Sequence, residues 1–165
     1  MIYSQFGQSE WILSTLKSLG VTNGHIFEAG ANIPDKISNS RIFVEDGWKS
    51  ILVEPQEKSF IRWQEFIRQN RYEDKTEIFN LEIPSNDNGL ENILKKVNSP
   101  YDLDALFLDI DGGEYQLIKG MESHRPKFIC VECDNSFPLS IEFIPRSIRH
   151  GWQASPMAFY KLMKE

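Results

Sequence analysis

Five short apolar runs recur along the chain, and they limit its fold more than any other feature of the sequence. Each run is almost continuously apolar, as expected of strands in a parallel sheet that is covered on both faces. The predicted strands are His25–Ala29, Ser50–Val53, Thr76–Phe79, Ala105–Ile110 and Phe128–Glu132. Helical patterns separate these runs, and strand–helix–strand units of this length form right-handed crossovers. The sequence therefore predicts an α/β domain with a doubly wound, mostly parallel sheet.

The segments between the strands carry the apolar spacing and end signals of amphipathic helices. Ser9 is expected to cap the first helix, and Gly20 to end it. The predicted apolar stripe of that helix is Trp11, Ile12, Leu16 and Leu19. Further helices are predicted at Ser40–Asp46, Glu57–Arg68, Leu90–Val97, Glu114–Met121 and Pro156–Lys164. No strand pattern follows the last of them.

The length and charge of the chain exclude several classes of protein. Its 165 residues, of which 41% are hydrophobic and 25% charged, predict one globular domain over residues 1–165. The net charge of −6 argues against general binding to nucleic-acid backbones. Neither a membrane-spanning apolar window nor a secretory signal pattern is present, so the sequence predicts a cytoplasmic protein without membrane or nucleic-acid partners.

The two cysteines, Cys130 and Cys133, have a C-x-x-C spacing that can indicate redox or metal chemistry. Both lie in or next to the predicted strand Phe128–Glu132. Side chains three residues apart on a strand point to opposite faces, so the two sulfur atoms are not expected to meet. The sequence therefore favours two buried thiols in a reducing compartment.

The end of the first predicted strand, Glu28-Ala29-Gly30-Ala31-Asn32, carries a carboxylate and a single glycine. In an open α/β sheet, ligands bind beyond the carboxyl ends of the strands. A dinucleotide site needs G-x-G-x-x-G there, so that backbone N–H groups hold the pyrophosphate. This end instead favours a cationic ligand without phosphate, and the amino and sulfonium groups of S-adenosylmethionine fit. An ordinary strand–loop turn is the alternative.

The second predicted strand ends in Glu54-Pro55, 26 residues after Glu28. An acid at this place, one βαβ unit further on, is positioned to accept hydrogen bonds from both hydroxyls of a ribose. An acid followed by proline also occurs for purely local reasons. The pair of Glu28 and Glu54 is therefore more informative than either residue alone.

The fourth predicted strand leads into Asp109-Ile110-Asp111-Gly112-Gly113-Glu114. Carboxylates that converge on one strand end are costly unless they meet a cation or a proton. We predict a functional role for Asp109. In the alternative interpretation, Glu114 only caps the following helix and Asp111 only fixes the glycine turn.

The fifth predicted strand ends in Glu132-Cys133-Asp134-Asn135. Asp109, Asp134 and Asn135 would together offer the oxygen ligands that Mg²⁺ prefers. The favoured interpretation is that Asp134 and Asn135 begin a turn. A divalent cation is thus possible at this edge, but no metal site is predicted.

These motifs, in this order, resemble those of the FkbM-type methyltransferases, a branch of the class I S-adenosylmethionine-dependent fold. The resemblance covers most of the chain. It runs through Ser4–Glu10, Glu28–Asn32, Ser38–Ser40, Gly47–Pro55, Leu108–Tyr115, and Arg125–Pro126 with Val131–Glu132. No single motif is decisive, but the ordered set with matching gaps is fairly specific.

The resemblance implies a role for each matching residue. The methionine and ribose side of the cofactor would be lined by Glu28, Gly30, Ala31 and Asn32. Glu54 would hold the ribose, and Asn80 would lie near the adenine. Asp109 would face the transferring methyl group as a general base or as the group that orients the acceptor. The complete set of predicted cofactor-binding residues is Glu28, Gly30, Ala31, Asn32, Glu54, Pro55, Asn80, Asp109 and Asp111.

The resemblance further implies O-methylation of a small-molecule or sugar hydroxyl. The acceptor is expected beneath the segment Asn135–Arg149. There, an apolar wall of Phe137, Phe143 and Ile144 and a rim of Arg146, Arg149 and His150 would surround it. A surface loop that packs on the core is the alternative for this segment.

Two departures from the family pattern bear on activity. Pro34, preceded by Ile33, stands where relatives carry the second glycine of the cofactor loop, and proline fixes φ and removes an N–H donor. Relatives also continue with two more strands, whereas this chain stops at Glu165. We expect either a truncated gene product or a sheet edge covered by the chain's own tail or by a second copy in a homodimer.

Two other functions compete with methyl transfer. A non-catalytic binding module would keep the fold and lose tight cofactor binding through Pro34 and the missing strands. A nicotinamide-dependent oxidoreductase is disfavoured, because the phosphate-binding glycines are absent.

Overall fold

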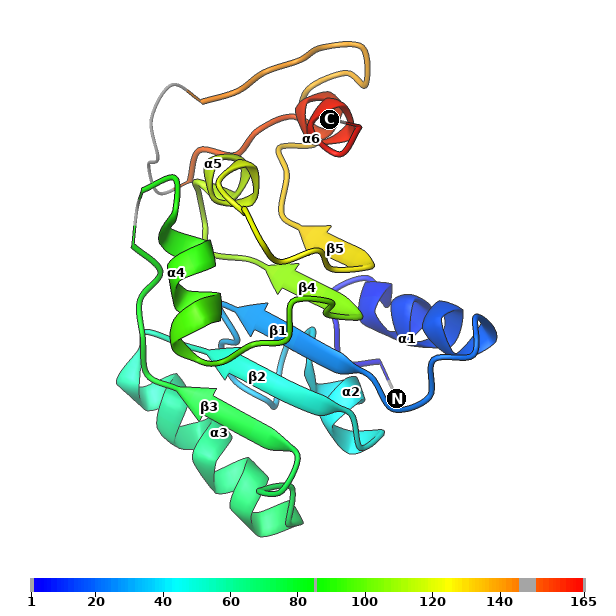
Figure 1. Cartoon of the computed structure of the whole chain (residues 1–165), viewed down its shortest axis with the longest axis vertical. Helices are drawn as coiled ribbons and strands as arrows, with labels where there is room; N and C mark the ends of the chain where they lie inside the picture. Colours follow the sequence, from blue (N-terminus) through cyan, green and yellow to red (C-terminus); the bar gives the residue numbers. More distant parts are fainter. Residues whose placement is uncertain (1, 85, 146–150, 165) are drawn as a thin grey trace.

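The fold is a five-stranded, all-parallel sheet with helices on both faces (Figure 1). The computed structural model describes residues 2–84, 86–145 and 151–164. The strands are β1 (His25–Ala29), β2 (Lys49–Val53), β3 (Thr76–Phe79), β4 (Ala105–Leu108) and β5 (Phe128–Val131). They are ordered β3-β2-β1-β4-β5, so the direction of winding reverses between β1 and β4. The predicted doubly wound α/β architecture is confirmed.

The two strands that lead into the acidic loops, β4 and β5, end earlier than predicted. β4 ends at Leu108 and β5 at Val131, rather than at Ile110 and Glu132. The Asp109 N–H still bonds the Ala29 carbonyl at 3.2 Å, but Asp111 has a φ of 60° and turns the chain out of the sheet. Asp109 and Ile110 therefore belong to the loop after β4.

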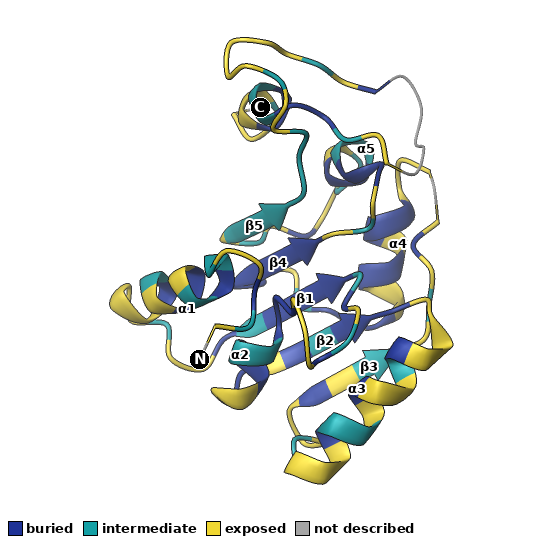
Figure 2. Cartoon of the chain, turned by 180° about the vertical axis from the view of Figure 1, so that it is seen from behind, coloured by how far each residue is buried: buried dark blue, intermediate teal, exposed yellow. Residues whose placement is uncertain are grey.

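Within the described residues, six helices cover the two faces of the sheet (Figures 1 and 2). They are α1 (Gln8–Ser18), α2 (Arg41–Glu45), α3 (Glu57–Asn70), α4 (Gly89–Lys96), α5 (Glu114–Lys119) and α6 (Pro156–Leu162). Buried side chains of the sheet form one apolar cluster with α4, α5 and α6 and two clusters with α1, α2 and α3. On β1, Ile26 packs with residues of α1 and α2, whereas Phe27 packs with residues of α4 and α5. This alternation follows from the two-residue period of a strand, and it places Glu28 on the α1–α2 face.

The start and the apolar face of α1 differ from the prediction. The helix begins at Gln8 after Gly7, so Ser9 lies inside the first turn rather than at the cap. The Ser9 hydroxyl instead donates to the Asn39 side chain at 3.3 Å, a tertiary contact that no local pattern reveals. The buried apolar residues are Ile12, Leu13 and Leu16, whereas the predicted stripe members Trp11 and Leu19 are exposed. The packing angle of the helix decides which residues are covered.

Both outer strands pair on one side only within the described ranges. β3 pairs with β2 and β5 pairs with β4, and all four residues of β5 are only half-buried. No strand follows β5 in the part of the chain that the structure describes. The covering of this edge by a second copy stays a prediction. None of the described helices has the length and apolarity required to cross a bilayer.

Candidate functional site

A pocket of about 450 Å³ opens at the carboxyl ends of β1, β2, β3 and β4. This is the place where strand order reverses and where open α/β sheets bind ligands. Six of the predicted cofactor residues line it, namely Gly30, Asn32, Glu54, Pro55, Asp109 and Asp111. The other described lining residues are Ile37, Val53, Gln56, Leu81, Glu82, Ile83, Ile110 and Gly112. The rule that ligands bind at strand ends thus located most of the pocket.

Gly30 allows the loops after β1 and β4 to lie against each other. It has a φ of 81°, and a Cβ atom built there would stand 1.8 Å from the backbone oxygen of Asp109. No side chain is compatible with that distance, and L residues rarely adopt that φ. The glycine therefore lets the Asp109 backbone pack against the loop after β1, and both residues line the pocket.

Glu54 lines the pocket with a carboxylate that is already oriented. Its two oxygens accept hydrogen bonds from the backbone N–H groups of Asn32, at 2.7 Å, and of Gln56, at 2.8 Å. The residue is only 3% exposed. Each carboxylate oxygen retains a further lone pair, so Glu54 can also accept from a ligand.

Asn80 supports this strand end from outside the pocket. Its side-chain amide donates to the backbone carbonyls of Glu54, at 2.9 Å, and of Pro55, at 3.0 Å. It is not among the described residues that line the pocket. The structure therefore gives Asn80 a role in fixing the backbone, and its predicted position near an adenine stays a prediction.

Glu28 and Ala31 also lie away from the described lining of the pocket. Glu28 is 1% exposed on the α1–α2 face and accepts a hydrogen bond from the Ser40 N–H at 3.1 Å. Burial raises the pKa of the Glu28 carboxyl to about 7. Ala31 packs beside Trp63, whose indole N–H donates to the Ala31 carbonyl at 3.1 Å. Glu28, the penultimate residue of β1, and Glu54, the residue after β2, therefore do not share the described lining of the pocket.

Three carboxylates meet at the ends of β4 and β5. Asp109, Asp111 and Glu132 each offer one oxygen, and these three oxygens lie within 4.8 Å of one another. Surrounding protein atoms and the charge of Asp111 raise the pKa of Asp109. Burial, together with the charge of Asp109, raises the pKa of Glu132 to about 7. The cluster is thus suited to hold a proton or a cation, including a hard metal ion.

The other acids of this edge stabilise turns. The Asp134 carboxylate accepts from the Ser136 N–H at 2.9 Å, a bond that lowers the pKa of Asp134 and is expected of a residue that begins a turn. Buried Glu114 accepts from the Gly112 N–H at 2.8 Å and closes the glycine turn before α5. The acids within 4.8 Å of Asp109 are therefore not those that the sequence suggested for magnesium.

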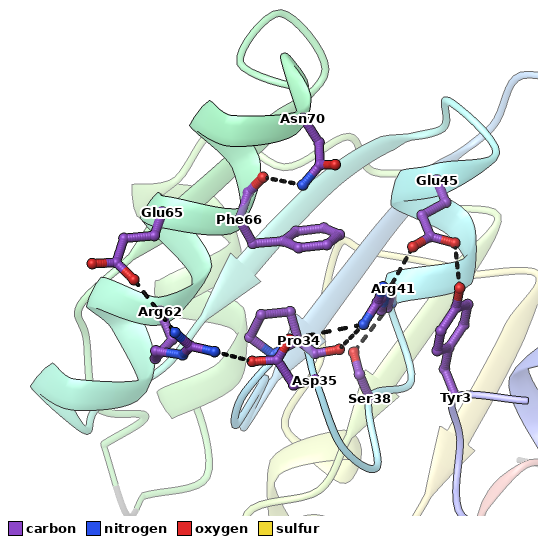
Figure 3. Close-up of polar contacts among 10 residues, drawn as sticks. All are labelled: Tyr3, Pro34, Asp35, Ser38, Arg41, Glu45, Arg62, Glu65, Phe66 and Asn70. Atoms are coloured by element: carbon purple, nitrogen blue, oxygen red, sulfur yellow. Dashed lines mark hydrogen bonds and ion pairs between the residues drawn. The ribbon is translucent and has the colours of Figure 1, made fainter.

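Pro34 does not fill the pocket. Ile33 and Lys36 form an isolated antiparallel bridge, and Pro34 and Asp35 make the turn between them. Proline is favoured in the first half of such a turn. Pro34 is buried, and its carbonyl accepts from the Arg41 guanidinium at 3.0 Å (Figure 3). The proline ring therefore does not lie among the described residues that line the pocket.

The described part of the predicted acceptor segment, residues 135–145, contacts α6 and the residue before it and is absent from the described lining of the pocket. Phe137 and Phe143 stack with ring centroids 4.6 Å apart, and the Phe143 N–H donates to the Ser155 hydroxyl at 3.0 Å. Neither ring nor Ile144 is among the described lining residues. Arg146, Arg149 and His150, the predicted rim, lie outside the described residues.

Sequence reasoning did not single out several residues that line the pocket. Leu81, Glu82 and Ile83 follow β3, so the strand-end rule would have found them. Ile37 carries no such signal, because it lies in the middle of the loop between β1 and α2.

Comparison with known proteins relates this fold to methyltransferases. No protein-family model and no curated protein matches the chain. The structure of the glycopeptide N-methyltransferase MtfA complexed with S-adenosyl-L-methionine is similar, with a TM-score of 0.55 at 9% identity, over 98% of this chain and 82% of that one. The METTL16 methyltransferase domain is also similar, with a TM-score of 0.52 at 16% identity, over 72% of this chain and 45% of that one.

A third similar structure is that of Podospora anserina PaMTH1 bound to S-adenosylhomocysteine, with a TM-score of 0.51 at 17% identity, over 68% of this chain and 44% of that one. The chain thus spans less than half the length of PaMTH1 and of the METTL16 domain. These likenesses show that it has the Rossmann-like methyltransferase fold. Membership of the FkbM-type family stays a prediction.

Proposed function

We propose that this protein is an S-adenosylmethionine-dependent methyltransferase whose methyl donor binds in the strand-end pocket. The observation that carries the proposal is the charge of the lining. Glu54, Glu82, Asp109 and Asp111 line the pocket, and no Lys, Arg or His is among the described lining residues. Such a surface repels phosphate and attracts the cationic amino and sulfonium groups of the donor. The similarity to methyltransferases bound to the donor or its product supports the same conclusion.

Each strand end has a distinct task in this proposal. The Glu54 carboxylate, held by the N–H groups of Asn32 and Gln56, accepts from the ribose hydroxyls. Gly30 leaves room for the ligand to approach the backbone, and the apolar residues Leu81 and Ile83 offer a surface to the adenine. These contacts would fix the donor in one orientation, which supplies much of the rate gain in a direct transfer.

Asp109 is placed to handle the proton of the acceptor. The donor, when bound, supplies an electrophilic methyl group on a positively charged sulfur. Asp109 would accept the proton of an acceptor hydroxyl while the hydroxyl oxygen takes the methyl group, and S-adenosylhomocysteine would leave as the S–C bond breaks. A raised pKa suits Asp109 to this role, because it brings the carboxylate closer in basicity to the group that it deprotonates.

The acceptor proposed first is the hydroxyl of a small molecule or sugar, as the family resemblance implies. The carboxylate cluster of Asp109, Asp111 and Glu132 favours a second candidate, an amine, because a protonated amine is drawn to clustered carboxylates and must lose a proton before it can attack. Incubation with methyl-labelled donor and matched hydroxyl and amine acceptors separates these candidates by the labelled product.

Calorimetric titration with S-adenosylmethionine, S-adenosylhomocysteine and NAD tests the proposal directly. We expect both S-adenosyl compounds to bind and NAD to fail. Glu54→Ala should weaken S-adenosylhomocysteine binding about 10- to 100-fold, the usual effect of removing a charged hydrogen-bond acceptor. Glu57→Ala, which removes an exposed carboxylate three residues away and outside the pocket, is the matched control and should bind like the wild type.

The rival functions give different outcomes in the same titration. Binding of NAD in preference to S-adenosylhomocysteine would refute the proposal in favour of an oxidoreductase. No binding of any of the three compounds by the folded protein would point to a non-catalytic module.

A further inference from the structure

Ile37, in the loop between β1 and α2, has a backbone conformation that β-branched residues rarely adopt. Its φ is 48°, in the left-handed region. The other described non-glycine residues with positive φ are asparagines, an aspartate and an arginine, namely Asn32, Arg71, Asn98 and Asp111. Such a conformation costs about 1–3 kcal/mol and persists only where the surroundings enforce it. The Ile37 side chain is nevertheless 55% exposed and lines the pocket.

Left-handed backbone is concentrated at this pocket. Gly30, Asn32, Asp111 and Gly112 also have positive φ, and all four line it. Glycine adopts this conformation without strain, and asparagine and aspartate at low cost, so Ile37 is the strained residue among them. Strained residues gather where a protein binds ligands, because the geometry of the site requires them. The conformation of Ile37 thus belongs to the construction of the pocket.

Contacts on both sides of Ile37 prevent the loop from relaxing. Before it, the Asp35 carboxylate pairs with Arg62 of α3, and the Pro34 carbonyl accepts from Arg41 of α2 (Figure 3). After it, the Ser38 N–H donates to the Tyr3 carbonyl at 3.1 Å. The segment that contains Ile37 is therefore fastened to α2, α3 and the N-terminal segment.

Arg41 is the centre of these contacts, and its own position depends on a planar guanidinium. That group lies 4.3 Å from the centroid of the Tyr3 ring and 4.9 Å from that of the Phe66 ring. Its Nε donates to Glu45 at 2.8 Å. A lysine would keep the charge and lose both the stacking and the forked hydrogen bonds.

We infer that Ile37 is an apolar contact residue for the nucleoside of the bound ligand, and that Arg41 is the positioning residue that holds it at the pocket. This inference rests on the proposed function. A ligand that buries an exposed isoleucine binds more tightly, because apolar surface is removed from water. The enforced backbone conformation holds the isoleucine in place before the ligand arrives, which lowers the cost of binding. The nucleoside is the part assigned, because the same loop binds Glu54, the proposed ribose acceptor, through the Asn32 N–H.

Ile37→Gly and Ile37→Asn test the contact, because both residues adopt positive φ readily. We expect each variant to bind S-adenosylhomocysteine and free adenosine about fivefold to twentyfold more weakly than the wild type, by the same factor for both ligands. The thermal midpoints of these variants should stay close to that of the wild type, because relief of backbone strain offsets the loss of the side chain's packing. Arg71→Gly is the matched control, because it also places glycine at a positive-φ residue but outside the described lining of the pocket. It should leave binding unchanged.

A double-mutant cycle tests the positioning role. Arg41→Lys should weaken adenosine binding in the wild type by several-fold and have much less effect in the Ile37→Gly background, because the residue it positions is gone. Equal effects in both backgrounds would show that Arg41 acts on stability alone and would overturn its assigned role.

The outcomes separate this inference from the proposed function. Suppose that the wild type binds S-adenosylhomocysteine, that Glu54→Ala binds it more weakly, and that the Ile37 variants bind it as the wild type does. The inference is then wrong, and the methyltransferase proposal stands. If the Ile37 variants lose affinity for S-adenosylhomocysteine but not for adenosine, the nucleoside assignment is wrong. If the wild type binds neither compound, both the function and the inference are overturned.

Discussion

Glu28→Gln is expected to stabilise the protein above neutral pH and to have little effect in acid. Burial raises the pKa of Glu28 from 4.5 to about 7, against the opposing effect of Ser40 and Asn39 beside it. Because the folded pKa lies above the unfolded one, the stability contributed by the neutral carboxyl is fully present below pH 4.5. It is lost as the pH rises through 7. Glutamine stays neutral over this whole range.

The size of the effect follows from the difference between the two pKa values. A displacement of about 2.5 pKa units corresponds to about 3 kcal/mol. For a domain of this length, a change of about 3 kcal/mol in the free energy of unfolding shifts the thermal midpoint by about 6–12 °C. The variant should therefore exceed the wild type by about that amount at pH 8.5 and match it near pH 4.5. Glutamine can still accept the hydrogen bond from the Ser40 N–H.

Urea unfolding at a series of pH values between 4.5 and 8.5 measures this directly. Glu10→Gln is a control of opposite sign. Although partial burial acts to raise the pKa of Glu10, hydrogen bonds from Ser4 and Tyr3 lower it overall. Removal of the Glu10 carboxylate should therefore destabilise the protein at pH 8.5 and have a smaller effect in acid. A Glu28→Gln protein no more stable than the wild type at pH 8.5 would refute the reasoning, since Glu28 would then be well solvated when ionised.

Two further predictions concern the close approach at Gly30 and the reactivity of Cys130. Gly30→Ala should destabilise by about 3 kcal/mol or more in urea unfolding, because its Cβ would clash with the Asp109 backbone oxygen. Gly20→Ala, at a similar φ of 87° but in open space, should cost only about 1–2 kcal/mol, and equal costs would contradict the clash. Because burial raises the pKa of the Cys130 thiol to about 11, a thiol reagent at pH 8 should label it slowly in the native state and rapidly in urea. Fast native labelling of both cysteines would contradict this.

The sequence by itself determined the architecture and most of the pocket. Apolar runs and helical spacing are local properties, and for this chain they give a parallel sheet with helices on both faces. The carboxyl ends of parallel strands meet at one edge, so the residues that follow them are brought together whatever the details of the loops. Glu54, Asp109 and Asp111 accordingly line the pocket as expected.

Tertiary structure alone decided which of these residues line the pocket and which support it from outside. Glu28 and Glu54 both lie at the carboxyl end of a strand region, but the Glu28 side chain lies on the α1–α2 face and accepts from the Ser40 N–H. The Arg41 guanidinium, which donates to the Pro34 carbonyl in the loop of Ile37, lies against the rings of Tyr3 and Phe66, and these three residues come from three separate segments. Local periodicity fixes the type of an element because it acts over a few residues. The direction of a loop depends on contacts between residues far apart in the chain, which no local pattern contains.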